Sequence, residues 1–89
     1  MKVHPTSIIH PKSKIDDSVE IGPFCIVGED VEIKKGSKLL SHTVLKGPTS
    51  IGEENIFYQF STIGEDTPDK KFKGEKTKLE IGDRNIFRE

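Results

Sequence analysis

The sequence lacks several features that would indicate common classes of protein. Cys25 is the only cysteine, so no internal disulfide can form and the cytoplasm is the default expectation. The N-terminal stretch MKVHPTSIIHPKSK has no apolar run long enough for a signal peptide, and nothing approaches the ~20 apolar residues of a membrane span. The net charge of −1 gives no reason to expect nucleic-acid binding.

Apolar residues are scarce as well. Of the 89 residues, 31% are hydrophobic and 33% are charged. A compact two-layer domain with so little apolar material would be marginal, because small chains bury a smaller fraction of their surface. The apolar residues must therefore be placed economically, or a partner must complete the core. They show no helical periodicity.

A period of six residues is present instead. Stepping by six from Val3 meets an apolar residue at every position as far as Ile63, and the phase returns at Ile81 and Phe87. The residue four places after each apolar position is small or medium-sized, and glycine often follows the apolar residue directly. This hexapeptide repeat predicts an all-β fold, a parallel β-helix with three short strands per coil.

The repeat also predicts which side chains point inward. Strand side chains alternate, so the apolar residue and the small residue two places before it both face the interior of a narrow prism. Cys25 occupies such a small inward slot, which argues for packing and against a nucleophilic role. Asn55 and Asn85 take the same slot, and we expect them at corners with a left-handed or tight backbone.

The period breaks after Ile63, because Asp69 and Glu75 stand where apolar residues are due. Proline, glycine and five lysines in segment 65–80 predict a loop extruded from the prism. Leu79 is expected at an inward position where the chain rejoins the β-helix. Such a loop can carry binding residues or can simply be solvated, and both interpretations stay open.

One phrase occurs twice, as IGEENIF at 51–57 and IGDRNIF at 81–87. The copies start five hexads apart, and five is not a multiple of three. The spacing therefore predicts that the two copies lie on different faces of the prism, at equivalent corners.

The three histidines are weak candidates for catalysis. His4 and His10 each precede proline and follow the apolar residue of their hexad, so we expect outward-facing surface positions. His42 lies at a corner with no serine, cysteine or carboxylate at a suggestive spacing, which favours a structural or surface role. No short motif has the spacing of a metal site.

Five longer stretches carry more information than the hexads alone: IGPFCIVG (21–28), LLSHTVLKG (39–47), IGEENIFYQFSTIGED (51–66), DKKFKGE (69–75) and LEIGDRNIFRE (79–89). Together they resemble a known family, the UDP-N-acetylglucosamine O-acyltransferases that begin lipid A synthesis. The resemblance is to the N-terminal part of the family and covers nearly the whole chain. It implies a left-handed β-helix and a homotrimer. It also implies transfer of an (R)-3-hydroxyacyl group from acyl carrier protein to the 3-hydroxyl of UDP-N-acetylglucosamine. We expect no cofactor and no metal.

The resemblance also assigns roles to residues. It implies that Asp69 helps to hold the sugar and that Lys71 reaches toward the substrate, where a lysine suits phosphate as a point charge. Pro68 and Lys70 depart from residues common in the family, so the details of substrate fit stay open. The general-base histidine of the family follows the IGDRN motif and falls beyond Glu89. We therefore expect residues 1–89 to be an incomplete β-helix segment, inactive alone, without the C-terminal coils and helical region.

Other functions remain as alternatives. A related N-acyltransferase of lipid A synthesis normally carries a domain ahead of its β-helix, whereas the hexads here begin at Val3. A sugar O-acetyltransferase that uses acetyl-CoA is a further enzyme alternative. A non-catalytic β-helix trimerisation scaffold is disfavoured by DKKFKGE, because a pure spacer gains nothing from breaking its own period.

Overall fold

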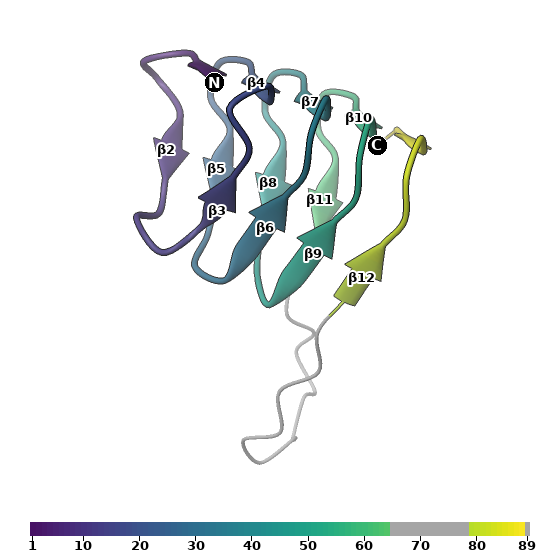
Figure 1. Cartoon of the computed structure of the whole chain (residues 1–89). Helices are drawn as coiled ribbons and strands as arrows, with labels where there is room; N and C mark the ends of the chain where they lie inside the picture. Colours follow the sequence, from purple (N-terminus) through teal and green to yellow (C-terminus); the bar gives the residue numbers. More distant parts are fainter. Residues whose placement is uncertain (65–78, 89) are drawn as a thin grey trace, which may run out of the picture.

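The computed structural model covers the whole chain and describes residues 1–64 and 79–88, which form thirteen short parallel strands (Figure 1). Sheet A, in spatial order, consists of β1 (Lys2–Val3), β4 (Glu20–Ile21), β7 (Lys38–Leu39), β10 (Ile56–Phe57) and β13 (Ile86–Phe87). Sheet B consists of β11 (Thr62–Ile63), β8 (Val44–Leu45), β5 (Ile26–Val27) and β2 (Ile8–Ile9). Sheet C consists of β12 (Leu79–Ile81), β9 (Thr49–Ile51), β6 (Val31–Ile33) and β3 (Lys14–Ile15).

The chain winds through the three sheets in turn, so each strand pairs with the strand three places along. In Figure 1 the chain advances from left to right while β3, β6, β9 and β12 run upward in front. The fainter strands β5, β8 and β11 run downward behind them. This is a left-handed winding, and it confirms the predicted left-handed parallel β-helix with three strands per coil.

The core follows the six-residue period. The buried hydrophobic residues are Val19, Ile21, Cys25, Val27, Val31, Ile33, Leu39, Leu45, Ile51 and Phe57. The small inward slots are buried too, and polar residues fill them at Ser37, Thr43, Thr49, Asn55 and Ser61. Cys25 is fully buried and its thiol lies 3.0 Å from the Leu40 carbonyl oxygen, which fits the predicted packing role. Branched aliphatic side chains suit these short strands because they pack well on a pleated surface.

The corners contain residues with a left-handed backbone, but the predicted positions are wrong. Asn55 and Asn85 do not have positive φ; the preceding residues Glu54 and Arg84 do, at 56° each. The slot residue leads directly into a strand and points its side chain inward, so the tight turn falls one residue earlier. Asn55 is fully buried and uses its amide to join neighbouring coils.

The prediction that the two copies of the recurring phrase lie on different faces is also wrong. β9 pairs with β12, so that Ile51 stands opposite Ile81, and Phe57 likewise stands opposite Phe87. The connection between β11 and β12 is two hexads longer than the one between β8 and β9. Two added hexads preserve the phase of the repeat but change the coil count, which places the copies directly on one another.

The predicted loop boundary also shifts. β12 begins at Leu79, so the segment predicted as loop, 65–80, includes two strand residues. Leu79 is in register with the inward-facing Thr49, as expected for its slot, and remains 43% exposed. The inserted segment, residues 65–78, lies outside the described residues.

Candidate functional site

The residues that flank the inserted segment, Gly64 and Leu79, lie at one corner of the β-helix, residues 46–49, where β8 leads into the start of β9. Gly64, at the departing end, has a φ of 79°, and a Cβ atom there would clash with the Lys46 carbonyl oxygen. At the returning end the Leu79 N–H donates to the Pro48 carbonyl oxygen at 3.0 Å. The Thr49 hydroxyl closes the corner by donating to the Lys46 carbonyl at 2.6 Å. The corner therefore fixes where the inserted segment leaves and returns.

The two residues that the resemblance assigns to the substrate, Asp69 and Lys71, belong to the inserted segment. They lie outside the described residues, so their contacts with a substrate stay a prediction. The described part of the chain includes only the residues that flank the segment, Gly64 and Leu79.

A hollow of about 240 Å³ lies beside this corner. It is lined by Lys12, Lys14, Asp30, Val31, Glu32 and Pro48. Its charged residues include both signs, two lysines and two carboxylates, so it has no net preference for an anion or a cation. The hollow therefore does not by itself indicate a ligand.

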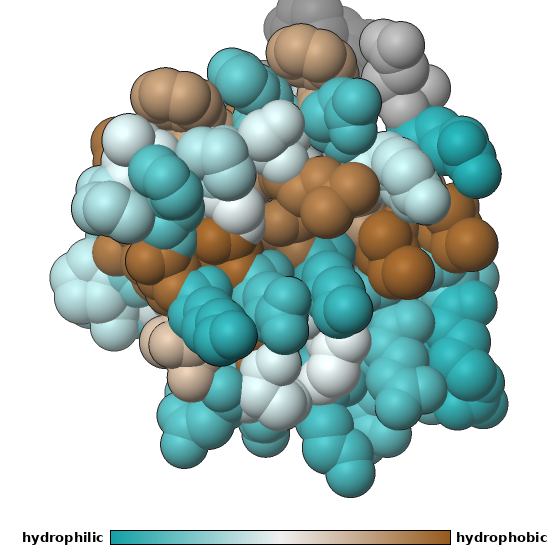
Figure 2. Space-filling model, turned by 90° about the horizontal axis from the view of Figure 1, so that it is seen from above, coloured by the Kyte–Doolittle hydropathy of each residue, from teal (hydrophilic) through white to brown (hydrophobic). Residues whose placement is uncertain are grey.

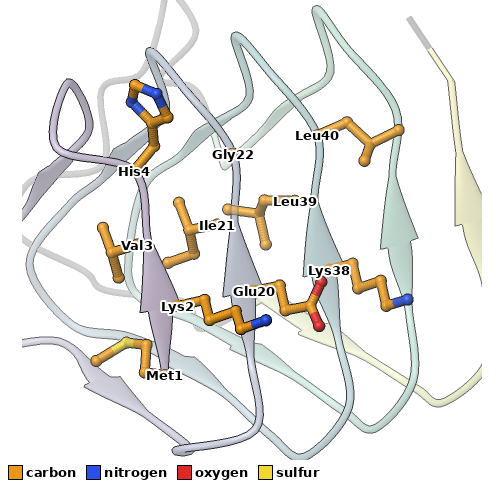
Figure 3. A pocket seen from close by; sticks show the side chains of 10 residues that line it. All are labelled: Met1, Lys2, Val3, His4, Glu20, Ile21, Gly22, Lys38, Leu39 and Leu40. Atoms are coloured by element: carbon orange, nitrogen blue, oxygen red, sulfur yellow. The ribbon is translucent and has the colours of Figure 1, made fainter.

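A larger hollow, about 600 Å³, lies over the strands of sheet A near the N-terminus (Figure 3). Lys2, Glu20 and Lys38 follow one another across three neighbouring strands, and Gly22 leaves a gap between His4 and Leu40. The charges alternate in sign along the row. This arrangement is a shallow surface trough with charges of alternating sign, and its lining holds no nucleophile beside a base.

The histidines have structural contacts. The Nδ1 atom of His4 accepts the Thr6 N–H at 3.2 Å, and that of His10 accepts the Lys12 N–H at 3.0 Å. Both contacts shape surface turns, which fits the outward positions predicted for these two residues.

His42 lies in an aromatic column that the sequence reasoning missed. Its ring centroid is 5.2 Å from that of Phe24 and 5.1 Å from that of Phe60. All three residues have positive φ at the corners between sheets A and B, and both phenylalanines are more than half exposed. The signal was present in the sequence, because the three aromatic rings recur at intervals of three hexads, which is one coil.

The outer faces differ in polarity. The outward row of sheet B is apolar at Ile8, Ile26 and Val44, whereas the outward row of sheet C is charged at Lys14 and Glu32. Figure 2 looks down on the top of Figure 1, where β4, β7 and β10 lie, and shows a band of hydrophobic side chains bordered by hydrophilic ones. Apolar surface is therefore concentrated on the outer face of sheet B and in the band that Figure 2 shows.

Asp16 forms two hydrogen bonds that stabilise its ionised form. The pKa of Asp16 is lowered, first by the hydrogen bond from the Ser18 backbone N–H at 2.9 Å and then by that from the Ser18 hydroxyl at 2.8 Å. Within residues 1–64 and 79–88, no group of three or more His, Cys, Asp or Glu side chains is placed to hold a metal ion. The same residues include no helix long and apolar enough to cross a membrane.

The fold and the inserted segment together define the class of the chain. It is a left-handed β-helix built from hexapeptide repeats, interrupted once at a corner. No family model matches the chain.

Curated relatives specify the class further. The chain is 59% identical over 87 residues to the acyl-[acyl-carrier-protein]–UDP-N-acetylglucosamine O-acyltransferase of Saccharophagus degradans. It is 49% identical over 88 residues to the enzyme of the same name from a Psychrobacter species. These alignments include 98% and 99% of the chain but 34% of each relative. The chain therefore spans about a third of the length of the curated relatives that it matches.

Solved structures of the same enzyme have the fold of this chain. The UDP-N-acetylglucosamine O-acyltransferase of Moraxella catarrhalis superimposes with a TM-score of 0.92 at 48% identity, over 100% of this chain and 35% of that one. The corresponding structure from Acinetobacter baumannii gives 0.90 at 49% identity, over 98% of this chain and 34% of that one. Nearly the whole chain is thus homologous to UDP-N-acetylglucosamine O-acyltransferases, of which it spans about a third of the length.

Proposed function

We propose that this chain is the N-terminal part of an acyltransferase that begins lipid A synthesis. The enzyme transfers an (R)-3-hydroxyacyl group from acyl carrier protein to the 3-hydroxyl of UDP-N-acetylglucosamine. The observation that carries the proposal is the 59% identity over 87 residues to a relative whose name states both the donor and the acceptor. Residues beyond this chain supply the rest of the site, including the general-base histidine that the resemblance places after the IGDRN motif. The reaction takes place in the cytoplasm.

Asp69 and Lys71 hold the sugar nucleotide in this proposal. A lysine ammonium attracts the diphosphate, and an aspartate accepts hydrogen bonds from sugar hydroxyls. The support from the described residues is indirect: Gly64 and Leu79, which flank the segment that carries these two residues, lie at the same corner, residues 46–49.

A chimera tests the proposal. Residues 1–89 replace the matching segment of the Saccharophagus degradans enzyme, and transfer from 3-hydroxyacyl carrier protein to UDP-N-acetylglucosamine is measured. We expect activity comparable to that of the parent enzyme. The substitution Lys71→Ala should raise the KM for the sugar nucleotide about tenfold, the loss expected for one charge-assisted contact. Lys76→Ala is the matched control and should change the KM for the sugar nucleotide little. A folded but inactive chimera would contradict the proposal.

The other lysines of the inserted segment attract the carrier protein, which is acidic. Their charge favours association through long-range attraction that salt screens. In the same chimera, Lys73→Glu combined with Lys76→Glu should raise the KM for the acyl carrier protein and leave that for the sugar nucleotide unchanged. An unchanged KM for the carrier protein would refute this role.

The protein assembles as a homotrimer in this proposal. The support is the exposed apolar surface formed by the outward residues of sheet B together with the aromatic column of Phe24, His42 and Phe60. Contiguous apolar surface of this kind is typical of an association site. Ultracentrifugation of the chain measures its oligomeric state.

A further inference from the structure

Small inward residues tie each coil to the next in the uninterrupted part of the β-helix. The Ser37 hydroxyl donates to the Gly52 carbonyl at 3.0 Å and accepts the Asn55 N–H at 3.1 Å. Ser7 makes the same pair of bonds, to the Gly22 carbonyl at 2.6 Å and from the Cys25 N–H at 2.9 Å. One hydroxyl therefore bridges two backbone groups of the coil that follows it.

The two copies of the recurring phrase are joined by a stronger version of this bridge. The Asn55 amide Nδ2 donates to the Gly82 carbonyl at 2.8 Å, and Oδ1 accepts the Asn85 N–H at 2.8 Å. A third bond runs in the opposite direction, because the Asp83 carboxylate accepts the Glu53 N–H at 2.7 Å. Hydrogen bonds to an ionised acceptor are the stronger kind.

Gly52 makes room for this third bond. A Cβ atom at Gly52 would clash with Oδ1 of Asp83, so the carboxylate packs directly against the glycine backbone. Gly52 and Asn55 of the first copy are thus explained by contacts with the second copy: Gly52 accommodates Asp83, and Asn55 bonds to the backbone of Gly82 and Asn85.

The reinforced bridge lies where register is otherwise least specified. Corners of the uninterrupted coils are short, so they fix the register of the next strand directly. β12 instead follows an insertion of two hexads, and closing the longer connection costs more conformational entropy. Because successive hexads resemble one another, a slipped pairing of β12 would still bury apolar side chains. The hydrogen bonds of Asn55 and Asp83, which fit only one alignment, select one register.

We propose that Asn55 and Asp83 are positioning residues that fix the register of β12 on β9 across the insertion. They thereby fix the point at which the segment carrying Asp69 and Lys71 returns to the β-helix. The consequence for the substrate rests on the proposed function, whereas the register lock itself is a property of the chain and holds without it.

Cysteine pairs report the register in the full chain. Ser50 and Glu80 are register partners on the outer face of β9 and β12, and Glu32 and Ser50 are partners on β6 and β9. The chains Ser50→Cys/Glu80→Cys and Glu32→Cys/Ser50→Cys should each form a disulfide on mild oxidation, because adjacent strands bring paired Cα atoms within disulfide range. The yield is measured by mass spectrometry. Cys25 is buried and does not compete.

The positioning variants are added to both pairs. Asp83→Ala should lower the yield of the 50–80 cross-link at least about threefold, because the carboxylate bond is lost, and should leave the 32–50 cross-link unchanged. Asp83→Asn keeps the acceptor oxygen and should restore the yield. Asn55→Ala should lower the 50–80 yield more than Asp83→Ala, because two bonds are lost.

Two results overturn the proposal. If Asp83→Ala lowers both cross-links equally, the residue contributes general stability and no register; if it lowers neither, the carboxylate bond has no role in register. The assay contains no substrate, so its failure leaves the proposed acyltransferase function untouched, and an inactive chimera leaves the register lock untouched.

Discussion

Sheets B and C have similar interiors and different surfaces. Their inward residues, Val27 and Leu45 in sheet B and Ile33 and Ile51 in sheet C, are all buried aliphatics. The outward residues differ: Ile26 at the centre of sheet B is 42% exposed, whereas its counterpart in sheet C is the charged Glu32. The β-helix therefore needs only its inward positions for folding, and the outer faces are free to specialise in association or solubility.

The largest expected effect comes from breaking the shared interior. Phe57 is fully buried and its ring stacks on Phe87 with centroids 4.7 Å apart. Phe57→Ala should lower the free energy of unfolding by about 3–5 kcal/mol, through lost transfer energy and the cavity left behind. Phe60→Ala is the matched control, because Phe60 is 60% exposed, and should cost about 1 kcal/mol or less. Urea denaturation measures both, and equal losses would refute the division into interior and surface.

The second-largest effect is expected from charge substitutions on the outer faces of sheets B and C. Ile26→Lys places a charge in the apolar row of sheet B, whereas Glu32→Lys replaces one charge with another in sheet C. If sheet B is covered in the proposed trimer, Ile26→Lys should weaken association by about 2 kcal/mol or more per buried ammonium. Sedimentation of both variants measures the effect. Dissociation by Glu32→Lys with no effect of Ile26→Lys would assign the interface to sheet C instead.

The interior could be predicted from the sequence because each inward position constrains a residue type. Val27, Leu45 and Ile63 recur every three hexads and stack in one sheet, so the period of six was enough to predict the strands. The coil count could not be predicted after Ile63. An insertion of two hexads leaves the phase unchanged, and the pairing of β9 with β12 and of β10 with β13 in the structure shows that the two copies are stacked.

The candidate site was less predictable for a different reason. Asp69 and Lys71 came from the resemblance, since a charged segment alone fits both a binding loop and a solvated one. The column of Phe24, His42 and Phe60 was missed because each ring occupies a corner, where the hexad pattern places no constraint on residue type. Its periodicity appears only when residues one coil apart are compared.

Removing one ring from the aromatic column of Phe24, His42 and Phe60 should have a smaller effect on stability. His42→Asn removes the central ring and keeps a residue that tolerates the positive φ of 58°. Loss of both ring contacts should lower the free energy of unfolding by about 1 kcal/mol. The control Asp30→Asn changes a corner with a φ of 61° that has no ring contact, and should have little effect. Thermal unfolding of the two variants compares them, and equal shifts would show that the stack contributes nothing.

The smallest effect concerns Asp16, a charged residue at the corner between sheets C and A. Two hydrogen bonds from Ser18 stabilise its ionised form and so lower its pKa in the folded chain. Its contribution to stability is therefore complete above the ordinary carboxyl pKa and is lost as the pH falls through the lowered folded value, with no change near neutrality. Ser18→Ala removes the hydroxyl bond but keeps the larger contribution of the backbone N–H, so the pKa should rise only part of the way back. An NMR titration of the Asp16 carboxyl measures this, and a complete return to the ordinary value would mean that the hydroxyl, rather than the backbone of this corner, holds the charge.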